Sequence, residues 1–202
     1  MTKEEEILKA AEEEFFANGY DASSTAVIAK RAGVTHAMVN YYFRTKERLF
    51  IQILDNHVYE LLKSLKPIMH DDGDVVSVAI DAALVIFDKL DDNRRLPFLL
   101  SDISRTHPEF LLRYKETVDT ICKDSIEMHS KRLDQCISNG KASQCTMADI
   151  YNTVLALVTA PFLNLPLLQN VAGFTSEQTD SYLLERRAEI AKVLEARYSA
   201  GR

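Results

Sequence analysis

The sequence lacks the motifs that carry the chemistry of most enzymes. Its 202 residues contain no glycine-rich phosphate loop, no serine nucleophile elbow and no metal-binding motif. An enzyme would need a convergent acid, base or nucleophile set, and none of these patterns supplies one. We therefore expect that the protein is not an enzyme and that it uses neither a cofactor nor a metal ion.

Cysteine is scarce, and the three cysteines, Cys122, Cys136 and Cys145, show no paired short spacing. An odd number of widely spaced cysteines is typical of reduced thiols in a cytoplasmic protein. A zinc site built from His129, Cys136 and Cys145 would lack a CxxC pair and a fourth ligand at a suitable spacing, so we discount it.

Long apolar runs are also missing. The most apolar stretch, residues 154–168, is interrupted by Pro161, Asn164 and Pro166. It is shorter than the roughly 20 residues that a membrane-spanning helix needs. The first ten residues, MTKEEEILKA, are acidic and amphipathic, whereas a signal sequence has an apolar segment. These features predict a soluble cytoplasmic protein with no membrane partner.

Strand periodicity and internal repeats are absent, and the patterns that are present are helical. We predict an all-α fold in which an N-terminal three-helix helix-turn-helix headpiece precedes a larger helical body. With 47% hydrophobic residues, the chain can bury one sizeable core beside the headpiece. Beyond the headpiece, the breaker residues predict helices over residues 46–66, 75–90, 94–105, 108–138, 147–169 and 176–198. The helix over residues 147–169 is predicted to bend around Pro161 and Pro166.

The most informative segment reads STAVIAKRAGVTHAMVNYYFRTKERL. Ser24 can cap a helix over residues 25–32, and Gly33 can end it because a residue without a Cβ tolerates the left-handed conformation. Val34 is predicted to fill the corner, and Thr35 is predicted to cap the next helix. Two helices joined by a short glycine-containing turn form a helix-turn-helix.

Helices as short as these are marginal in water, so neighbouring helices must support them. Thr45 can cap one such helix, which begins at Lys46. The other covers residues 5–18 and ends at Gly19, with its apolar side chains on one side. These apolar residues are Ile7, Leu8, Ala11, Phe15 and Phe16.

The second short helix presents a face suited to DNA. If Val39 faces inward and each residue turns the helix by 100°, Thr35 and Phe43 also face inward. The outward residues include no carboxylate, which is unusual for an exposed helix. They are Ala37, Met38, Asn40 and Tyr41. Asparagine can pair with the N6/N7 edge of adenine, and alanine or methionine can contact a thymine methyl, so this face fits the major groove.

Residues at the margins of this face can reach bases or phosphates. His36 and Tyr42 flank it, while Lys46 and the backbone amides near Thr25 suit phosphate oxygens. The formal net charge is −6, yet residues 21–50 hold five basic and two acidic side chains. Because phosphate affinity depends on nearby charges, an acidic body is compatible with DNA binding.

The runs AxxAGVT…VxYYFxTKExL and ILKAAEEEFFANGYDASS, at the N-terminus of a chain of this length, resemble the TetR family of bacterial transcriptional regulators. The resemblance implies a DNA-binding domain over residues 1–48 and an effector-binding and dimerisation domain over residues 49–202. The family often has Lys, Gly and Tyr where this chain has His36, Ala37 and Asn40, and Pro in place of Arg44. The residues that the resemblance places at DNA are Thr25, Thr35, His36, Ala37, Met38, Asn40, Tyr41, Tyr42 and Lys46.

A homodimer is expected because one recognition helix reads only a few base pairs, and a two-fold operator needs two headpieces. The run TVLALVTAPFL is apolar nearly all round, and the resemblance implies a four-helix interface from the last two helices of each subunit. The candidate contacts are Leu155, Val158, Phe162, Tyr182, Leu183, Ile190, Val193 and Leu194. The alternative is that both helices only complete the core of the monomer.

The resemblance also implies a pocket in the body for a small, mostly apolar effector. The predicted helix from Pro108 carries polar atoms on an apolar stripe, which can orient a ligand. The stripe consists of Leu111, Tyr114, Val118, Ile121, Cys122, Ser125, His129, Leu133 and Cys136. Tyr114, Ser125 and His129 are the candidate polar contacts, and Phe87, Phe98 and Phe110 are candidate walls. Alternatively, all of them are core side chains that are satisfied locally.

These features predict a sequence-specific transcriptional regulator, namely a homodimeric repressor that a small effector releases from a palindromic double-stranded operator. Two alternatives stay open. An activator of the same fold is chemically indistinguishable, because the sign of regulation depends on where the operator lies. A helical adaptor would use the helix-turn-helix as a scaffold and would not respond to DNA.

Overall fold

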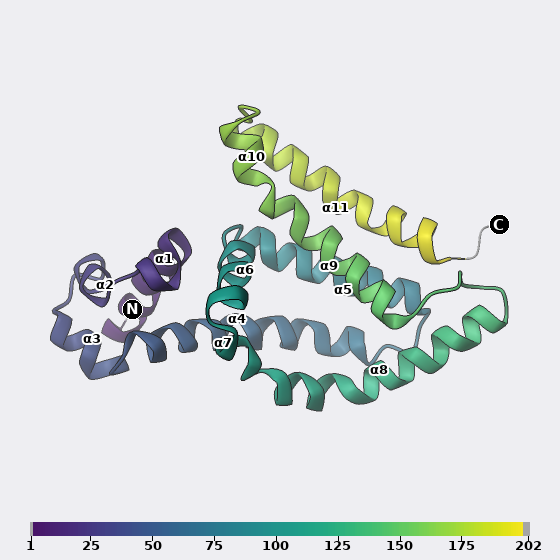
Figure 1. Cartoon of the computed structure of the whole chain (residues 1–202), viewed down its shortest axis with the longest axis horizontal. Coiled ribbons are helices and arrows are strands. Elements are labelled where there is room, and N and C mark those ends of the chain that lie inside the picture. The colour runs from purple at the N-terminus through teal and green to yellow at the C-terminus, as the bar shows by residue number, and fades with distance from the viewer. Residues whose placement is uncertain (1, 200–202) are drawn as a thin grey trace. The chain divides into compact units, whose positions relative to one another are not determined.

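The computed structural model describes residues 2–199, apart from the side chains of residues 121 and 122, and this part of the chain is helical (Figure 1). Its single β-type pairing is an isolated bridge between Ala142 and Ser199. The helices are α1 (Lys3–Ala22), α2 (Thr25–Arg31), α3 (His36–Phe43), α4 (Lys46–Met69), α5 (Val75–Asp92), α6 (Leu96–Thr106), α7 (Pro108–Leu112), α8 (Lys115–Ser138), α9 (Met147–Leu163), α10 (Leu165–Asn170) and α11 (Ser176–Tyr198). The all-α prediction is confirmed. The thiol of Cys122 and the side chain of Ile121 lie outside the described residues.

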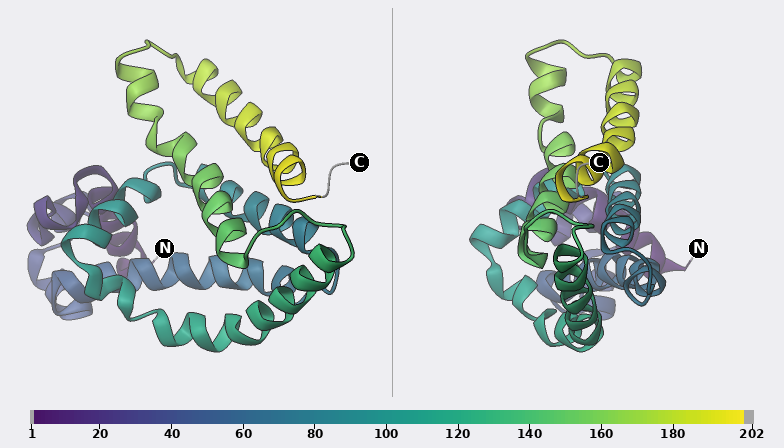
Figure 2. Two further views of the ribbon diagram at one scale, coloured as in Figure 1. Left: turned by 45° about the vertical axis from the view of Figure 1, so that its right-hand side comes forward. Right: turned by 90° about the vertical axis from the view of Figure 1, so that its right-hand side faces the viewer.

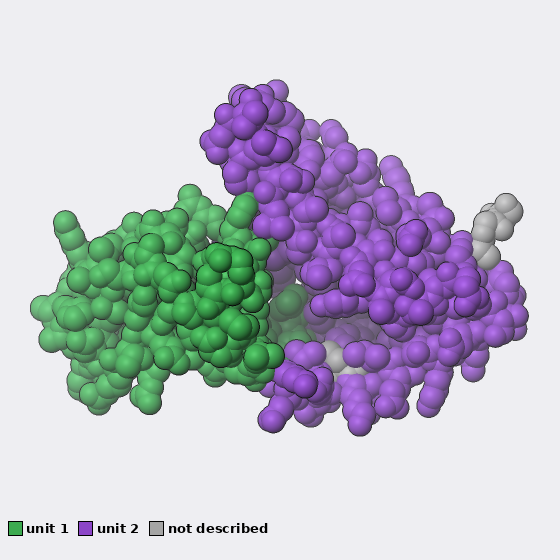
Figure 3. All heavy atoms as spheres, viewed as in Figure 1, with its two compact units in different colours: residues 1–62, 95–114 green, residues 63–94, 115–202 purple. Residues whose placement is uncertain are grey.

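The chain divides into two compact units (Figure 3). Unit 1 comprises residues 1–62 and 95–114, and unit 2 comprises residues 63–94 and 115–202. Unit 1 therefore contains α1–α3, most of α4, α6 and α7, whereas unit 2 contains the end of α4, α5 and α8–α11. The predicted boundary after residue 48 concerns function and falls inside the continuous α4, so it stays a prediction.

Unit 1 has an apolar core to which each of its helices contributes. The Phe15 ring of α1 lies edge-on to the Phe50 ring of α4, with 4.9 Å between the ring centroids. Helices α2 and α3 have only 7 and 8 residues, so their stability depends on this packing. They are anchored in the core by Ile28, Val39 and Phe43.

Unit 2 is built around longer helices. Helix α5 packs against α9 and α11, which also pack against each other and run in opposite directions (Figure 2). The Phe87 ring of α5 and the Phe162 ring of α9 lie 4.9 Å apart between centroids. The side chains buried around them include Val154, Val158, Leu183, Ile190 and Leu194.

Local sequence signals set several helix ends as predicted. Ser24 Oγ accepts a hydrogen bond from the Ala26 amide at 3.3 Å, and Thr45 Oγ1 accepts one from the Arg48 amide at 3.1 Å. Helix α11 begins and ends at the predicted residues, and Thr175 caps its start through a reciprocal bond pair with Gln178. Each of these caps forms between residues within one helical turn of each other, so the local sequence predicts it.

Two predicted helix ends at breaker residues are wrong. Gly19 does not end α1 but kinks it, with φ 75° and ψ 175°, and helical structure resumes as far as Ala22. Pro67 does not end α4, which continues to Met69. A proline in the last turn removes only a hydrogen bond near the frayed end of the helix, so its cost there is small.

Two predicted long helices are each divided. The helix predicted over residues 108–138 breaks at Arg113 and Tyr114, where Tyr114 Oη donates to Asp55 of α4 at 2.7 Å. The helix predicted over residues 147–169 breaks at Asn164, because Pro166 has no amide hydrogen and restricts the residue before it.

Candidate nucleic-acid interface

The turn between α2 and α3 adopts the predicted geometry. Gly33 has a φ of 63°, which a residue without a Cβ tolerates at low cost. The Val34 amide donates to the Ala29 carbonyl at 3.0 Å, and the Val34 side chain packs against the core of unit 1. Thr35 Oγ1 accepts a hydrogen bond from the Met38 amide at 3.3 Å, which confirms Thr35 as the cap of α3. The helix-turn-helix is therefore fixed by both local and core contacts.

The inward side of α3 is largely as predicted. Val39 and Phe43 are 2% and 4% exposed and belong to the core of unit 1. Thr35 differs from the prediction, because its side chain is exposed rather than inward. A capping residue lies outside the helix proper and has extended backbone angles, so a helical wheel does not describe it.

The outward side of α3 presents small apolar, amide and aromatic side chains. Ala37, Asn40 and Tyr41 are exposed, whereas Met38 is half-buried. The side-chain amide of Asn40 has no hydrogen-bonding partner within residues 2–199. Tyr41 is 70% exposed, and its ring lies edge-on to that of Tyr42 at 5.3 Å between centroids. The face is thus open to a partner, and Asn40 can offer it both a donor and an acceptor.

Lys46, a predicted phosphate contact, has several partners within the chain. Its Nζ donates to the carbonyl oxygens of Tyr20, Asp21 and Ser23 at 3.0, 3.4 and 3.3 Å. It also lies 4.3 Å from the centroid of the Tyr20 ring. The ammonium group therefore caps the C-terminal end of α1, where a helix leaves carbonyls without partners. An ammonium group has only three hydrogens, so this capping competes with a phosphate contact.

The chain leaves α3 through a γ-turn at Arg44. Arg44 has φ 65° and ψ −50°, and the Thr45 amide donates to the Phe43 carbonyl at 2.7 Å. This conformation is rare and strained for a residue with a Cβ. Arg44 and Thr45 are the only residues between α3 and α4, and no glycine or asparagine marks this turn in the sequence.

Two further ties of α1 were not predicted. Glu14 has a side chain that is only 4% exposed, and its Oε2 lies 3.2 Å from Nη2 of Arg31 on α2. His107 precedes α7, and its Nε2 lies 2.9 Å from Asp21 while its Nδ1 lies 3.1 Å from Glu109. The hydrogen bonds with Asp21 and Glu109 raise the pKa of His107 above its usual 6.5. The contacts of Glu14 with Arg31 and of His107 with Asp21 join residues far apart in the chain, so they leave no local signal.

The profile of "Bacterial regulatory proteins, tetR family" matches residues 7–53, which cover α1–α3 and the start of α4. This N-terminal segment is therefore similar to the DNA-binding domain of the TetR family.

The relatives that match this chain are named as transcriptional regulators or activators. It is 40% identical over 55 residues to the HTH-type transcriptional regulator QacR of Staphylococcus aureus, which is 27% of this chain and 29% of QacR. It is 25% identical over 122 residues to the HTH-type transcriptional activator FasR of Mycolicibacterium smegmatis, which is 60% of this chain and 55% of FasR. The chain thus matches less than two thirds of the length of these relatives.

The fold extends beyond the matched domain. The crystal structure of SCO4942 from Streptomyces coelicolor superposes with a TM-score of 0.68 at 18% identity, over 99% of this chain and 100% of that one. At such an identity the likeness concerns the fold alone.

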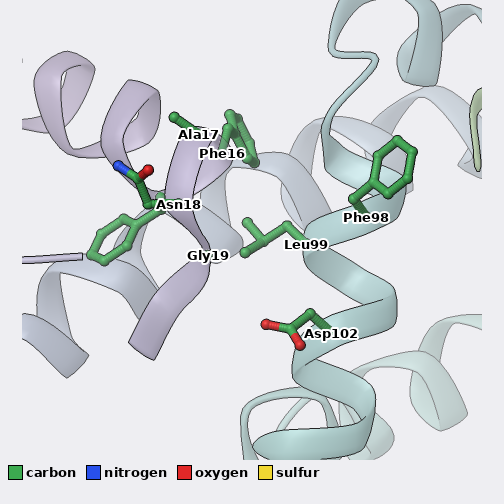
Figure 4. A pocket seen from close by; sticks show the side chains of 8 residues that line it. Phe16, Ala17, Asn18, Gly19, Phe98, Leu99 and Asp102 are labelled. Atoms are coloured by element: carbon green, nitrogen blue, oxygen red, sulfur yellow. The ribbon is translucent and has the colours of Figure 1, made fainter. Parts of the chain in front are cut away.

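The candidate effector residues fall into both units. Phe98, Phe110 and Tyr114 belong to unit 1. Phe110 is buried in its core, and Tyr114 bonds Asp55. Burial, followed by the bond to Asp55, raises the pKa of Tyr114. Of the six candidates, only Phe98 lines the cavity of about 230 Å³ between α1 and α6 that Figure 4 shows. This cavity is smaller than the usual 300–1,000 Å³ of a ligand pocket.

The other three candidates belong to unit 2. Phe87 packs on Phe162 in the core, while Ser125 and His129 are buried on α8. His129 Nε2 lies 3.0 Å from the Met69 carbonyl. Its Nδ1 is buried and has no hydrogen-bonding partner within the described residues. A buried nitrogen without a partner is costly, which leaves His129 as the candidate with the strongest physical reason to receive a ligand.

The candidate dimer contacts need correction. Five of the eight are buried inside unit 2 and have no surface to offer to a partner: Val158, Phe162, Leu183, Ile190 and Leu194. Tyr182 is half-buried, and Leu155 and Val193 are exposed. The predicted stripe of α11 therefore faces mainly the chain's own core. For these residues this agrees with the alternative that the helix completes the core of the monomer.

Two other sequence expectations concern a membrane span and a metal site. Residues Met147–Asn170 are long and apolar enough for a membrane span by composition, but they form two helices, and a third of the most apolar window is buried against the rest of the chain. Among the residues that the structure describes, no group of three or more His, Cys, Asp or Glu side chains is placed to hold a metal ion.

Proposed function

We propose that this chain is a DNA-binding transcriptional regulator, and specifically a homodimeric repressor of the bacterial cytoplasm. The observation that carries the proposal is the outward face of α3. Ala37 and Tyr41 are exposed on this face, the Asn40 amide is unpaired within the described residues, and the face carries no carboxylate. Asparagine and small apolar side chains match the donor, acceptor and methyl pattern of the major groove. The TetR-family match over residues 7–53 supports the same activity.

The direct test is a gel shift with double-stranded fragments that cover the DNA flanking the encoding gene. We expect a discrete complex that weakens as salt rises, because phosphate neutralisation releases counterions. A folded protein that binds no duplex at low salt would instead fit the adaptor alternative, in which the helix-turn-helix is a scaffold.

We place the dimer contact on the exposed side of α9–α11, since half-sites lie about one helical turn apart or multiples of it and require two headpieces. The support is a set of large exposed apolar side chains on these helices and the turn that follows α10, which are costly to leave in water. They are Leu155, Leu163, Leu167, Val171, Leu184 and Val193.

Light scattering after size exclusion tests this contact. We expect a dimer that Leu184→Glu weakens, because Leu184 on α11 is 69% exposed. The matched control is Leu112→Glu on α7 of unit 1, where an equally exposed leucine should tolerate the same change. A wild-type monomer at micromolar concentration would contradict the proposed dimer.

Release by a small, mostly apolar effector completes the proposal, with Phe87, Ser125 and His129 of unit 2 as candidate contacts. The buried Nδ1 of His129 supports this assignment, because a ligand donor would satisfy it. An effector found by thermal-shift screening must weaken operator binding, and operator must weaken its binding by the same factor. Unequal factors would exclude this linkage.

An activator is the second candidate, because the relative FasR is named a transcriptional activator. A reporter gene placed behind the bound operator separates the two functions. Repression predicts that deletion of the regulator raises expression, and activation predicts that it lowers expression.

A further inference from the structure

Two side chains of the helix-turn-helix meet across its outer surface. Thr25 is the first residue of α2 and His36 is the first residue of α3, and the turn at Gly33 brings these two helix starts together. Thr25 Oγ1 and His36 Nε2 lie 3.0 Å apart. Thr25 is half-buried and His36 is exposed, so the pair lies at the surface of the headpiece.

The contact with Thr25 leaves one ring nitrogen of His36 free. Within residues 2–199, Nδ1 of His36 has no hydrogen-bonding partner. A threonine hydroxyl both donates and accepts. If the ring is neutral and the hydroxyl donates to Nε2, the ring proton resides on Nδ1. If the ring is charged, Nε2–H donates to the hydroxyl and Nδ1 is still protonated. The pair can therefore present an Nδ1–H donor in both charge states.

A donor at the start of α3 has a defined class of target. The N-terminal residues of a recognition helix contact base edges in the major groove. Purine N7 is an acceptor on that edge in both guanine and adenine, and guanine adds O6. A single ring N–H matches a single acceptor of this kind, whereas the opposite tautomer would have to accept from a base amino group.

We propose that Thr25 and His36 form one reading unit, in which Thr25 orients the His36 ring and His36 donates from Nδ1 to N7 of one purine in each operator half-site. Thr25 is a positioning residue, and His36 is the residue that determines specificity. This inference rests on the proposed DNA-binding function and assigns one base contact within it.

The neighbouring residue provides a matched control. Ser24, not Thr25, caps α2, because Ser24 Oγ accepts from the Ala26 amide. Thr25→Val therefore removes the hydroxyl that faces His36 and leaves the cap intact. Ser24→Ala removes the cap at the same helix start and does not touch His36. A loss that follows from α2 stability alone should appear in Ser24→Ala, whereas a loss of ring orientation should appear only in Thr25→Val.

The experiment begins with selection of an operator by the wild-type protein from a random duplex library. Each purine of the selected site is then replaced in turn by its 7-deaza analogue, which exchanges N7 for C–H, and binding is measured by fluorescence anisotropy. We expect one purine per half-site at which the replacement weakens wild-type binding about tenfold, the scale of one base contact. His36→Ala should lose this sensitivity entirely.

The Thr25 variants separate positioning from structure. Thr25→Val should reduce the sensitivity at the same purine to about threefold, and Thr25→Ser should restore it, because serine keeps the hydroxyl. Ser24→Ala should keep the full sensitivity. The double variant Thr25→Val/His36→Ala should behave as His36→Ala does, since coupled residues are not additive.

Three results overturn the inference. If Thr25→Val keeps the full N7 dependence, Thr25 does not position the ring. If His36→Ala weakens binding to every duplex equally and keeps the N7 dependence, His36 contacts a phosphate. If the wild-type protein selects no duplex at all, the proposed function fails together with this inference, whereas the first two results leave the proposed function intact.

Discussion

Units 1 and 2 differ in what holds their helices together. Unit 1 contains the short helices α2, α3 and α7. Polar contacts tie α1 to its neighbours through Lys46, through Glu14 with Arg31, and through His107 with Asp21. Unit 2 contains longer helices with a continuous apolar seam around Phe87 and Phe162. Its ion pairs, such as Arg187 with Asp88 at 2.6 Å, lie at the surface.

Helix length explains this difference. A helix of two turns, such as α2, cannot bury enough apolar area to fix its own position, so unit 1 adds directional contacts such as that between Arg31 of α2 and Glu14. Longer helices gain enough from burial, and exposed ion pairs add little. The contrast predicts that unit 2 is sensitive to the volume of its core side chains, whereas unit 1 is also sensitive to charge and pH.

The largest effect is expected in the apolar seam of unit 2. Phe162 is fully buried, so Phe162→Ala should lower the free energy of unfolding by about 3–5 kcal/mol through lost burial and a cavity. Urea denaturation followed by circular dichroism measures this change. A loss below about 1 kcal/mol would mean that the seam does not hold unit 2 together.

Next in size is the cap that Lys46 places on α1. Lys46→Met keeps the side-chain length and removes three charge-assisted hydrogen bonds, so we expect a loss of about 2 kcal/mol in the stability of unit 1. Thermal denaturation checks it. If stability is unchanged and the salt dependence of DNA binding falls by about one unit, Lys46 is a phosphate ligand after all.

The pair of Glu14 and Arg31 gives a smaller effect. Arg31→Met leaves a buried carboxylate without its partner, but Arg31 is 44% exposed, so solvent screening reduces the expected loss to about 1–2 kcal/mol. Glu14→Leu/Arg31→Met should recover most of the stability, because both polar groups are then gone. A double-mutant cycle in urea measures the coupling, and additive losses would exclude it.

The smallest effect concerns pH and His107. Asp21 faces Nε2 of His107 and Glu109 faces Nδ1. Both carboxylates raise the pKa of His107 in the folded state, so the folded protein holds the second ring proton more tightly. Its contribution to stability is complete below the unfolded pKa near 6.5 and declines as the pH rises through the raised folded value.

Urea titrations of the wild type and His107→Gln at several pH values test this. The stability difference between the two proteins should be larger at pH 5.5 than at pH 8.5. The other groups around the ring differ in their pH windows: Glu109 has a lowered pKa and titrates in acid, and Tyr20, which packs on the ring, has a raised pKa. A difference that grows with pH would contradict the assignment.

Sequence patterns predicted those features that depend on residues within a turn or two. The caps at Ser24, Thr35 and Thr45, the turn at Gly33, and the buried side of α3 all follow from local hydrogen bonding or from helical periodicity. The start of α11 follows for the same reason.

Features that depend on distant partners were not predictable in this way. The break before α8 follows from the bond between Tyr114 and Asp55, and the position of Lys46 follows from three carbonyls more than 20 residues away. The stripe of α11 was assigned to a dimer interface because periodicity identifies an apolar face but not which surface covers it. The DNA-contact and effector residues therefore remain predictions that need binding measurements.

The most direct test of the central claim measures what Asn40 contributes to the choice of sequence. Anisotropy titrations compare the wild type and Asn40→Ala on the selected operator and on a scrambled duplex of equal length. If the outward face of α3 reads bases, Asn40→Ala should weaken operator binding by about 1–3 kcal/mol and leave binding to the scrambled duplex unchanged. An equal loss on both duplexes would contradict the account.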